Sequence, residues 1–343
     1  MPESMLNYFY ITAAAYRSKK AAVLRKEDKS MKLVIIEPLG VEKEKLLAMA
    51  AEQLPESVEV VYYDTRVTDT ETLIERGKDA DIIAVSNLPL NADVIDGCKN
   101  LKMLSVAFTG VDHIALEACR RNGVLVSNCA GYSTAAVADL VFGLLISLYR
   151  NIPACNDAVR NEGTKEGLVG FELEGKKFGV VGTGAIGLRT AAVAQAFGCE
   201  VLAYSRTKKE VPGVTYTDLD TLLSQCDIIS LHTPLNESTR GLIGKEQLAL
   251  MKKNAVLINT SRGPVVDSQA LAEALNTEQI AGACIDVFET EPPIKKEHPL
   301  LNAKHVIATP HAAFATKEAL IKRAVIVFDN IAAWLNNAPQ NVM

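Results

Sequence analysis

Short apolar segments alternate with helical patterns along almost the whole chain, and this alternation constrains the fold more than any other feature of the sequence. From residue 32, helical patterns separate the apolar segments KLVIIEP, VEVVYYD, DIIAVS, LKMLSVAF and VLVSN. Strands and helices in this order are typical of βαβ units, which place their strands in a parallel sheet. Residues 31–128 are therefore expected to form an α/β domain.

A second series of the same kind follows the long helix predicted at residues 133–150. Its apolar segments are KKFGVVG, CEVLAYS, DIISLHT, AVLINTS, IAGACIDVF and HVIATP. The sequence thus predicts a second parallel-sheet domain at residues 129–313. The last predicted helix, residues 316–336, has no strand after it. We expect it to pack back on the first domain, which then consists of residues 31–128 and 314–343, with the second domain as an insertion.

The composition fits globular domains and argues against several kinds of partner. Apolar residues make up 48% of the chain and charged residues 22%. The net charge of -5 gives no basic surface for nucleic acid. Seven scattered cysteines include no Cys-x-x-Cys pair, so we expect buried, reduced thiols in a cytoplasmic protein and no metal site. No apolar run is long enough to span a membrane.

Residues 1–30 differ from the rest of the chain, because basic residues outnumber acidic ones there. The apolar part of this segment precedes the basic residues, which is the wrong order for a secretory signal. We expect a poorly ordered extension in front of Met31, with a transit peptide as the alternative.

A G-x-G-x-x-G motif, GTGAIG at residues 182–187, is the clearest binding motif in the chain. It follows the apolar segment at residues 178–181 and opens a helical pattern that runs to Phe197. At such a junction the glycines permit a tight turn, and the helix N-terminus can receive a pyrophosphate. The second domain is therefore predicted to be a Rossmann domain. The motif residues assigned to the cofactor are Gly182, Gly184, Ala185, Ile186 and Gly187.

The residues after the next predicted strand bear on the choice between NAD and NADP. Where NAD-binding chains carry an acidic residue, this chain has Ser205, Arg206, Thr207, Lys208 and Lys209. No carboxylate repels a 2′-phosphate there, and Arg206 can hold the phosphate through two hydrogen bonds. The alternative is a run of ordinary surface cations. We expect NADP or NAD as the cofactor, with NADPH favoured.

Five motifs occur in the order and spacing found in the D-isomer-specific 2-hydroxyacid dehydrogenases, and the chain resembles this family from about residue 32 onward. They are GLVGFELEGKKFGVVGTGAIG, LHTPLNEST, NAVLINTSRGPVVD, GACIDVFETEP and ATPH. The resemblance implies a Rossmann domain inserted in a discontinuous, flavodoxin-like substrate domain. It also implies NAD(P)-dependent reduction of a small 2-keto acid.

The resemblance assigns three catalytic residues. Arg262 is expected to bind the substrate carboxylate and keto oxygen, a role that suits a planar and permanently charged guanidinium. His311 is expected to exchange the proton of the reacting oxygen, because histidine titrates near neutral pH. Glu291 is expected to orient His311 and to stabilise its imidazolium form.

Further residues are placed along the cofactor and the substrate by the same resemblance. Asp286 is expected near the nicotinamide carboxamide. The other residues expected along the cofactor are Ser205, Arg206, Thr233, Pro234, Thr239 and Thr260. The substrate carboxylate is expected at the backbone amides of Thr109, Gly110 and Val111 in the stretch FTGVD. Leu88 is expected to bind the substrate as part of a specificity loop, SNLPL.

Within the family, the segments SVAFTGVDHI and YSRTKK look most like glycerate dehydrogenases, which are also called hydroxypyruvate or glyoxylate reductases. One alternative is a D-lactate-type dehydrogenase acting on pyruvate or a longer 2-keto acid, which the HAAFAT stretch also permits. The other is a corepressor-like protein that binds the cofactor and recruits partners. Relatives dimerise through the region of the very apolar residues 135–148, so a homodimer is expected.

Overall fold

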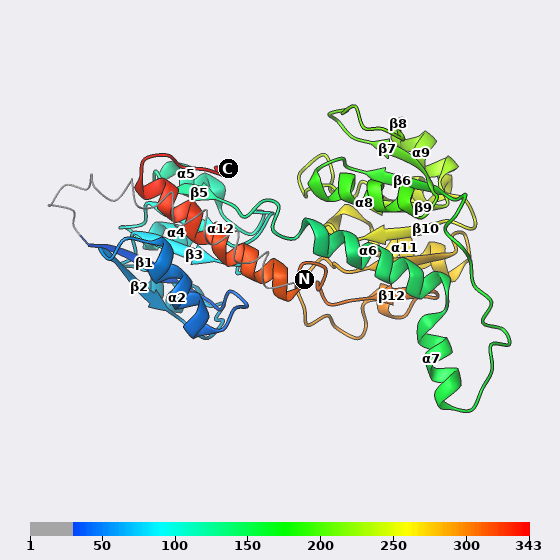
Figure 1. The fold of residues 1–343 in the computed structure, drawn as a ribbon, viewed down its shortest axis with the longest axis horizontal. Helices are drawn as coiled ribbons and strands as arrows, with labels where there is room; N and C mark the ends of the chain where they lie inside the picture. The colour runs from blue at the N-terminus through cyan, green and yellow to red at the C-terminus, as the bar shows by residue number, and fades with distance from the viewer. Residues whose placement is uncertain (1–29) are drawn as a thin grey trace, which may run out of the picture.

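The computed structural model describes residues 30–343, which form two α/β domains, each built around a parallel β-sheet (Figure 1). This confirms the predicted fold class. The expected N-terminal extension, up to residue 29, lies outside the described residues.

The first sheet has five strands in the order β2-β1-β3-β4-β5, and all of its pairs are parallel. Its strands are β1 (Met31–Ile35), β2 (Val58–Tyr62), β3 (Ile82–Val85), β4 (Met103–Val106) and β5 (Leu125–Ser127). The helices between them are α2 (Lys43–Gln53), α3 (Thr70–Gly77), α4 (Ala92–Gly97) and α5 (Leu116–Arg121). This is the flavodoxin-like strand order. The chain adds β2 on one side of β1 and the later strands on the other side, so the strand order reverses between β1 and β3. The loops that follow these two strands therefore border a crevice.

The second sheet has seven parallel strands in the order β12-β11-β10-β9-β6-β7-β8, which is a Rossmann order extended by one strand. Its strands are β6 (Lys177–Val181), β7 (Glu200–Tyr204), β8 (Val214–Tyr216), β9 (Ile228–Leu231), β10 (Val256–Asn259), β11 (Gly282–Ile285) and β12 (Val306–Ala308). Its helices are α6 (Thr134–Tyr149), α7 (Ile152–Arg160), α8 (Ala185–Ala196), α9 (Leu219–Gln225), α10 (Lys245–Leu250) and α11 (Ser268–Asn276), with short 3-10 turns η1 (Gly263–Val265) and η2 (Pro299–Leu301).

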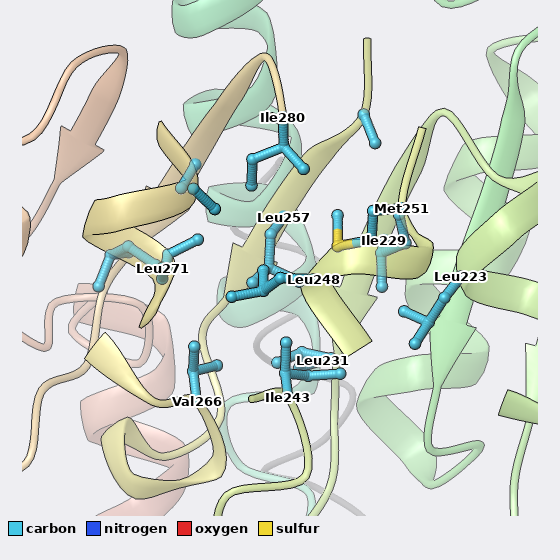
Figure 2. Packing of buried hydrophobic residues seen from close by; sticks show 14 of the residues in the cluster. Leu223, Ile229, Leu231, Ile243, Leu248, Met251, Leu257, Val266, Leu271 and Ile280 are labelled. Carbon is cyan, nitrogen blue, oxygen red and sulfur yellow. The ribbon is translucent and has the colours of Figure 1, made fainter. Parts of the chain in front are cut away.

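Apolar clusters cover both faces of the seven-stranded sheet. One face packs against α9, α10 and α11, and Figure 2 shows Leu248 of α10 together with Leu257 of β10. The other face packs against α6 and α8. Strands that are buried on both faces consist almost entirely of apolar residues. The apolar segments of the sequence predicted these strands for that reason.

Four short elements were not predicted: α4, α7, α10 and β8. Helix α7 has no buried residue, and β8 has three residues of which none is buried. An apolar pattern arises only where a side chain is removed from water, so α7 and β8 leave little trace in the sequence, whereas α4 and α10 are only six residues long.

Helix α12 (Lys317–Leu335) follows the seven-stranded sheet in the chain and packs on the five-stranded one, against α2 and β4 (Figure 1). The hydroxyl of Thr316 caps it by accepting a hydrogen bond from the Ala319 N–H at 3.1 Å. Val327, Phe328 and Ile331 on this helix are fully buried. These contacts support the proposal that residues 31–128 and 314–343 form one discontinuous domain.

The described residues include no single helix that is long and apolar enough to cross a membrane, although the bent pair α6 and α7 meets that test when the two are taken together. All seven cysteines are free thiols. Six of them are buried and Cys155 is only partly buried, which differs from the expectation that all would be buried.

We predict that Phe328→Ala destabilises the five-stranded domain by about 3 to 5 kcal/mol, because it leaves a cavity in a fully buried site. Urea unfolding followed by the fluorescence of Trp334, the single tryptophan and itself on α12, measures this loss. Lys322→Ala on the exposed face of α12 is the control, with an expected change within about 0.5 kcal/mol. An unchanged transition in Phe328→Ala would contradict the assignment of α12 to this domain.

Candidate functional site

A cavity of about 760 Å³ lies between the two domains, where the carboxyl ends of strands from both sheets face each other. Open α/β sheets bind ligands at this edge. The lining segments follow β4, β6, β9, β10 and β12 and include residues 108–112, 184–187, 232–235, 260–262 and 313–314.

The three glycines after β6 meet different steric demands. Gly182 has φ of +100°, and a Cβ there would lie 2.6 Å from the carbonyl oxygen of His232. A Cβ on Gly187 would overlap the carbonyl oxygen of Gly182. At Gly184, by contrast, a Cβ would meet nothing within 4 Å. The outer glycines therefore permit the turn, whereas Gly184 borders open space that a ligand can enter.

Polar groups around this turn lack partners within the described protein. No side chain caps the N-terminus of α8, whereas Asp218 and Asp267 cap α9 and α11. The buried hydroxyls of Thr183, Thr233 and Thr260 have no hydrogen-bond partner. An uncapped helix N-terminus beside unpaired hydroxyls suits the pyrophosphate and the polar groups of a dinucleotide. The residues present therefore fit this cofactor.

The other residues expected along the cofactor divide into two groups. Thr233, Pro234 and Thr260 line the cavity. Thr239 does not, because its hydroxyl donates to the Pro234 carbonyl at 2.6 Å and closes the 234–239 loop. Ser205 and Arg206, on the loop after β7, also lie outside the cavity lining, and Arg206 is exposed.

Asp286 is fully buried and does not line the cavity, which differs from its expected place at the carboxamide. Its carboxylate accepts hydrogen bonds from the Thr309 hydroxyl at 2.6 Å and from the N–H groups of Ala312 and Ala313 at 2.8 and 3.0 Å. The backbone carbonyl of Asp286 accepts a further hydrogen bond from the His311 N–H at 2.7 Å. A buried carboxylate needs such donors, and here the loop around His311 supplies them.

Among the expected substrate residues, Thr109, Gly110 and Val111 line the cavity, whereas Leu88 does not. Leu88 is fully buried, and its N–H donates to Glu37 Oε1 at 3.0 Å. The expectation that Leu88 faces the substrate therefore differs from the structure. A Cβ on Gly110 would overlap the guanidinium of Arg262, so any side chain at this position would displace Arg262.

The structure pairs two of the three expected catalytic residues, His311 and Glu291, and places the third, Arg262, on the same cavity as His311. His311 Nδ1 lies 2.9 Å from both carboxylate oxygens of Glu291. Burial raises the pKa of Glu291, but the hydrogen bond from His311 and the charges of His311, Arg262 and Arg66 together hold that pKa below its usual value. Arg262 and His311 line the cavity, and Glu291 lies behind His311.

Arg262 is held by an acid from the other domain. Its Nε donates to the two carboxylate oxygens of Asp112 at 3.1 and 3.3 Å, and its Nη1 donates to the Ser261 carbonyl at 2.8 Å. Sequence reasoning named the stretch FTGVD but gave Asp112 no role of its own. The pairing depends on side chains 150 positions apart, so no local pattern could reveal it.

Aromatic edges surround the ring of His311. The ring centroids of Phe108 and Phe314 lie 5.6 and 5.3 Å from that of His311, both in edge-to-face geometry. A second histidine, His232, also lines the cavity, but burial lowers its pKa to about 4. His232 is therefore neutral near pH 7 and is not suited to donate a proton to a substrate.

Comparisons with known proteins identify the family. Residues 142–313 match the family model described as the D-isomer specific 2-hydroxyacid dehydrogenase, NAD binding domain. The chain is 37% identical over 295 residues to a hydroxypyruvate reductase of Blautia hydrogenotrophica, covering 83% of this chain and 91% of that one. It is 35% identical over 314 residues to a glyoxylate reductase of Aeropyrum pernix, covering 85% and 93%. A solved acyclic imino acid reductase in complex with NADPH and D-Arg has a TM-score of 0.83 at 32% identity, covering 91% of this chain and all of that one.

We predict that Gly184→Ala folds normally but binds NADPH at least about tenfold more weakly, because the added methyl enters the space open to the pyrophosphate. Titration of NADPH fluorescence measures the affinity, and thermal unfolding without cofactor measures stability. Gly187→Ala is the contrasting variant, which should lose stability because its methyl overlaps backbone. Unchanged NADPH affinity in Gly184→Ala would argue against this path for the cofactor.

Proposed function

The chain belongs to the D-isomer-specific 2-hydroxyacid dehydrogenases, and we propose that it reduces a small 2-keto acid, hydroxypyruvate or glyoxylate, with NADPH or NADH. The observation that carries this proposal is the His311–Glu291 pair at a cavity that Arg262 also lines. The names of the two similar reductases support the substrate class.

Each of these residues has a role that follows from its position. A nicotinamide bound at the glycine turn would supply a hydride for the carbonyl carbon of the substrate. Arg262 Nη2, next to Gly110, binds the substrate carboxylate together with the backbone amides of residues 109–111. His311 donates a proton to the oxygen that becomes the hydroxyl, and Glu291 stabilises the imidazolium that donates it.

The cavity wall around His311 favours a small substrate side chain. Phe108 and Phe314 lie against the histidine ring, and Tyr132 packs beside both phenylalanines. These rings make the cavity wall beside His311 apolar. A D-lactate-type activity on pyruvate is the closest alternative, and a corepressor-like protein would bind the cofactor without rapid turnover.

We also propose a homodimer. Exposed apolar side chains gather on α7 and the segment after it, where Val159 is 70%, Val169 84% and Phe171 63% exposed. In Figure 1 α7 projects away from the rest of its domain. Apolar side chains so exposed on a projecting arm are typical of a surface that another subunit covers.

Free thiols support a location in the cytoplasm. All seven cysteines are unpaired, and six of them are buried. Reducing compartments keep thiols in this state. We therefore propose a cytoplasmic enzyme.

We predict that His311→Gln lowers the turnover of hydroxypyruvate and glyoxylate by about 10²- to 10⁴-fold, because the general acid is lost, and leaves NADPH binding unchanged. The assay follows oxidation of the reduced cofactor with hydroxypyruvate, glyoxylate, pyruvate and a longer 2-keto acid. His298→Gln is the matched control, because His298 also pairs with a glutamate, Glu289, at 2.9 Å outside the cavity. Near-normal turnover in His311→Gln would remove His311 from the mechanism. The wild type turning over none of the four acids would favour the corepressor-like alternative.

For the cofactor, we predict a higher kcat/KM with NADPH than with NADH. Arg206→Ala should lower the NADPH value several-fold, because a charge-assisted bond to the 2′-phosphate is lost, and should spare the NADH value. Steady-state kinetics with both cofactors measure the two effects. Equal losses with both cofactors would show that Arg206 does not bind the phosphate, and a wild-type preference for NADH would contradict the proposal.

The homodimer predicts a light-scattering mass of about twice the 37.0 kDa of one chain. Val169→Glu should lower that mass toward a single chain, because it places a charge in the covered surface. Thr164→Glu adds the same side chain at an exposed polar position of the same segment and should remain a dimer. A wild-type mass of one chain at micromolar concentration contradicts the proposal.

A further inference from the structure

A buried carboxylate in the five-stranded domain begins a line of polar contacts that ends at His311. Glu37 follows β1 and is 1% exposed. Its Oε1 accepts hydrogen bonds from the N–H groups of Ser86 and Leu88 at 2.8 and 3.0 Å, and its Oε2 pairs with Arg66. Because these donors come from the loop after β3, Glu37 fixes the backbone on either side of Asn87.

Arg66 then sets the orientation of the Asn87 amide. Its Nη1 donates to Asn87 Oδ1 at 2.8 Å, and its Nη2 donates to the Asn87 carbonyl at 3.4 Å. A guanidinium only donates, so the oxygen of the amide must face Arg66 and the nitrogen must face away. That nitrogen, Nδ2, donates to Glu291 Oε2 at 3.3 Å.

The Asn87–Glu291 contact joins the two domains directly behind the proton donor. The same Oε2 of Glu291 lies 2.9 Å from His311 Nδ1. We infer that Asn87 is a positioning residue for Glu291. The five-stranded domain supplies Asn87, and Arg66 and Glu37 hold it in place. The inference rests on the proposed function, because it assigns Asn87 a role through the His311–Glu291 pair.

The charged groups around Glu291 come from both domains, and they determine how a new charge at position 87 would affect the pKa of Glu291. His311, Arg262 and Arg66 face it as cations or potential cations. Asp112 pairs with Arg262, and Glu37 pairs with Arg66. His113 lies nearby, and burial lowers its pKa, so it contributes no charge near pH 7. A single new anion at position 87 would therefore act on a site that is otherwise close to balanced.

Asn87→Asp tests the inference, because it keeps the shape of the side chain and replaces the donor with a negative oxygen. Like charges disfavour ionisation of Glu291, and an added anion favours the imidazolium form of His311. Both limits of the pH profile of kcat/KM for the keto acid should therefore move to higher pH, by about one unit. Asn87→Ala, which removes the donor without adding charge, should raise only the acid limit, and by less.

The matched control is Asn91→Asp in the same loop region. Asn91 caps α4 by accepting from the Val94 N–H at 3.0 Å, which aspartate also does. Its pH profile should equal that of the wild type. A shift of equal size in Asn91→Asp would show a general charge effect and overturn the inference.

Two further outcomes would overturn it. A pH profile of Asn87→Asp that superimposes on the wild type would exclude positioning of Glu291. A changed KM for the keto acid at every pH with unmoved limits would assign Asn87 to direct substrate contact instead. Failure of the proposed function is distinguishable, because the wild type would then turn over none of the keto acids or His311→Gln would retain turnover, whereas failure of this inference leaves both of those results as predicted.

Discussion

The buried carboxylate of Asp286 fixes the position from which His311 acts. Removing a carboxylate from water is costly unless donors replace the lost hydration, and here one hydroxyl and two backbone amides do so. The backbone of His311 has φ of +55°, a left-handed conformation that is unfavourable for such a residue. The same aspartate therefore holds a strained backbone in place, and the ring that projects from it meets Glu291 and two aromatic edges.

The remaining parts of the site are assembled across the boundary between the sheets. Asp112 holds Arg262, Asn87 contacts Glu291, and Phe108 packs on His311. In each pair the first residue lies in the five-stranded domain and the second follows a strand of the seven-stranded sheet. Neither domain alone contains the full set, so the geometry of the reacting groups depends on how the two domains meet.

The features predicted from the sequence are those with a local physical signature. Strands buried on both faces appear as apolar runs, and the glycine turn appears as a motif because Gly182 and Gly187 leave no room for a side chain. The fold class and the glycine loop could therefore be read from the chain. Helix α7 and strand β8 bury too little to produce a pattern.

Side-chain partners across the domains could not be predicted in the same way. Leu88 was expected to face the substrate, but the carboxylate of Glu37 draws the backbone around it inward. Asp286 was expected at the cofactor, but its oxygens are taken by the loop of His311. Each difference comes from a buried charge whose hydrogen-bond donors lie far along the chain.

The loop after β7 contains no such buried charge. It carries its basic side chains on the surface, and Arg206 is exposed there. Substitutions in such a loop disturb no packing. Evolution can therefore change whether the enzyme draws its electrons from NADPH or from NADH with almost no loss of stability, while the chemistry at His311 stays constant.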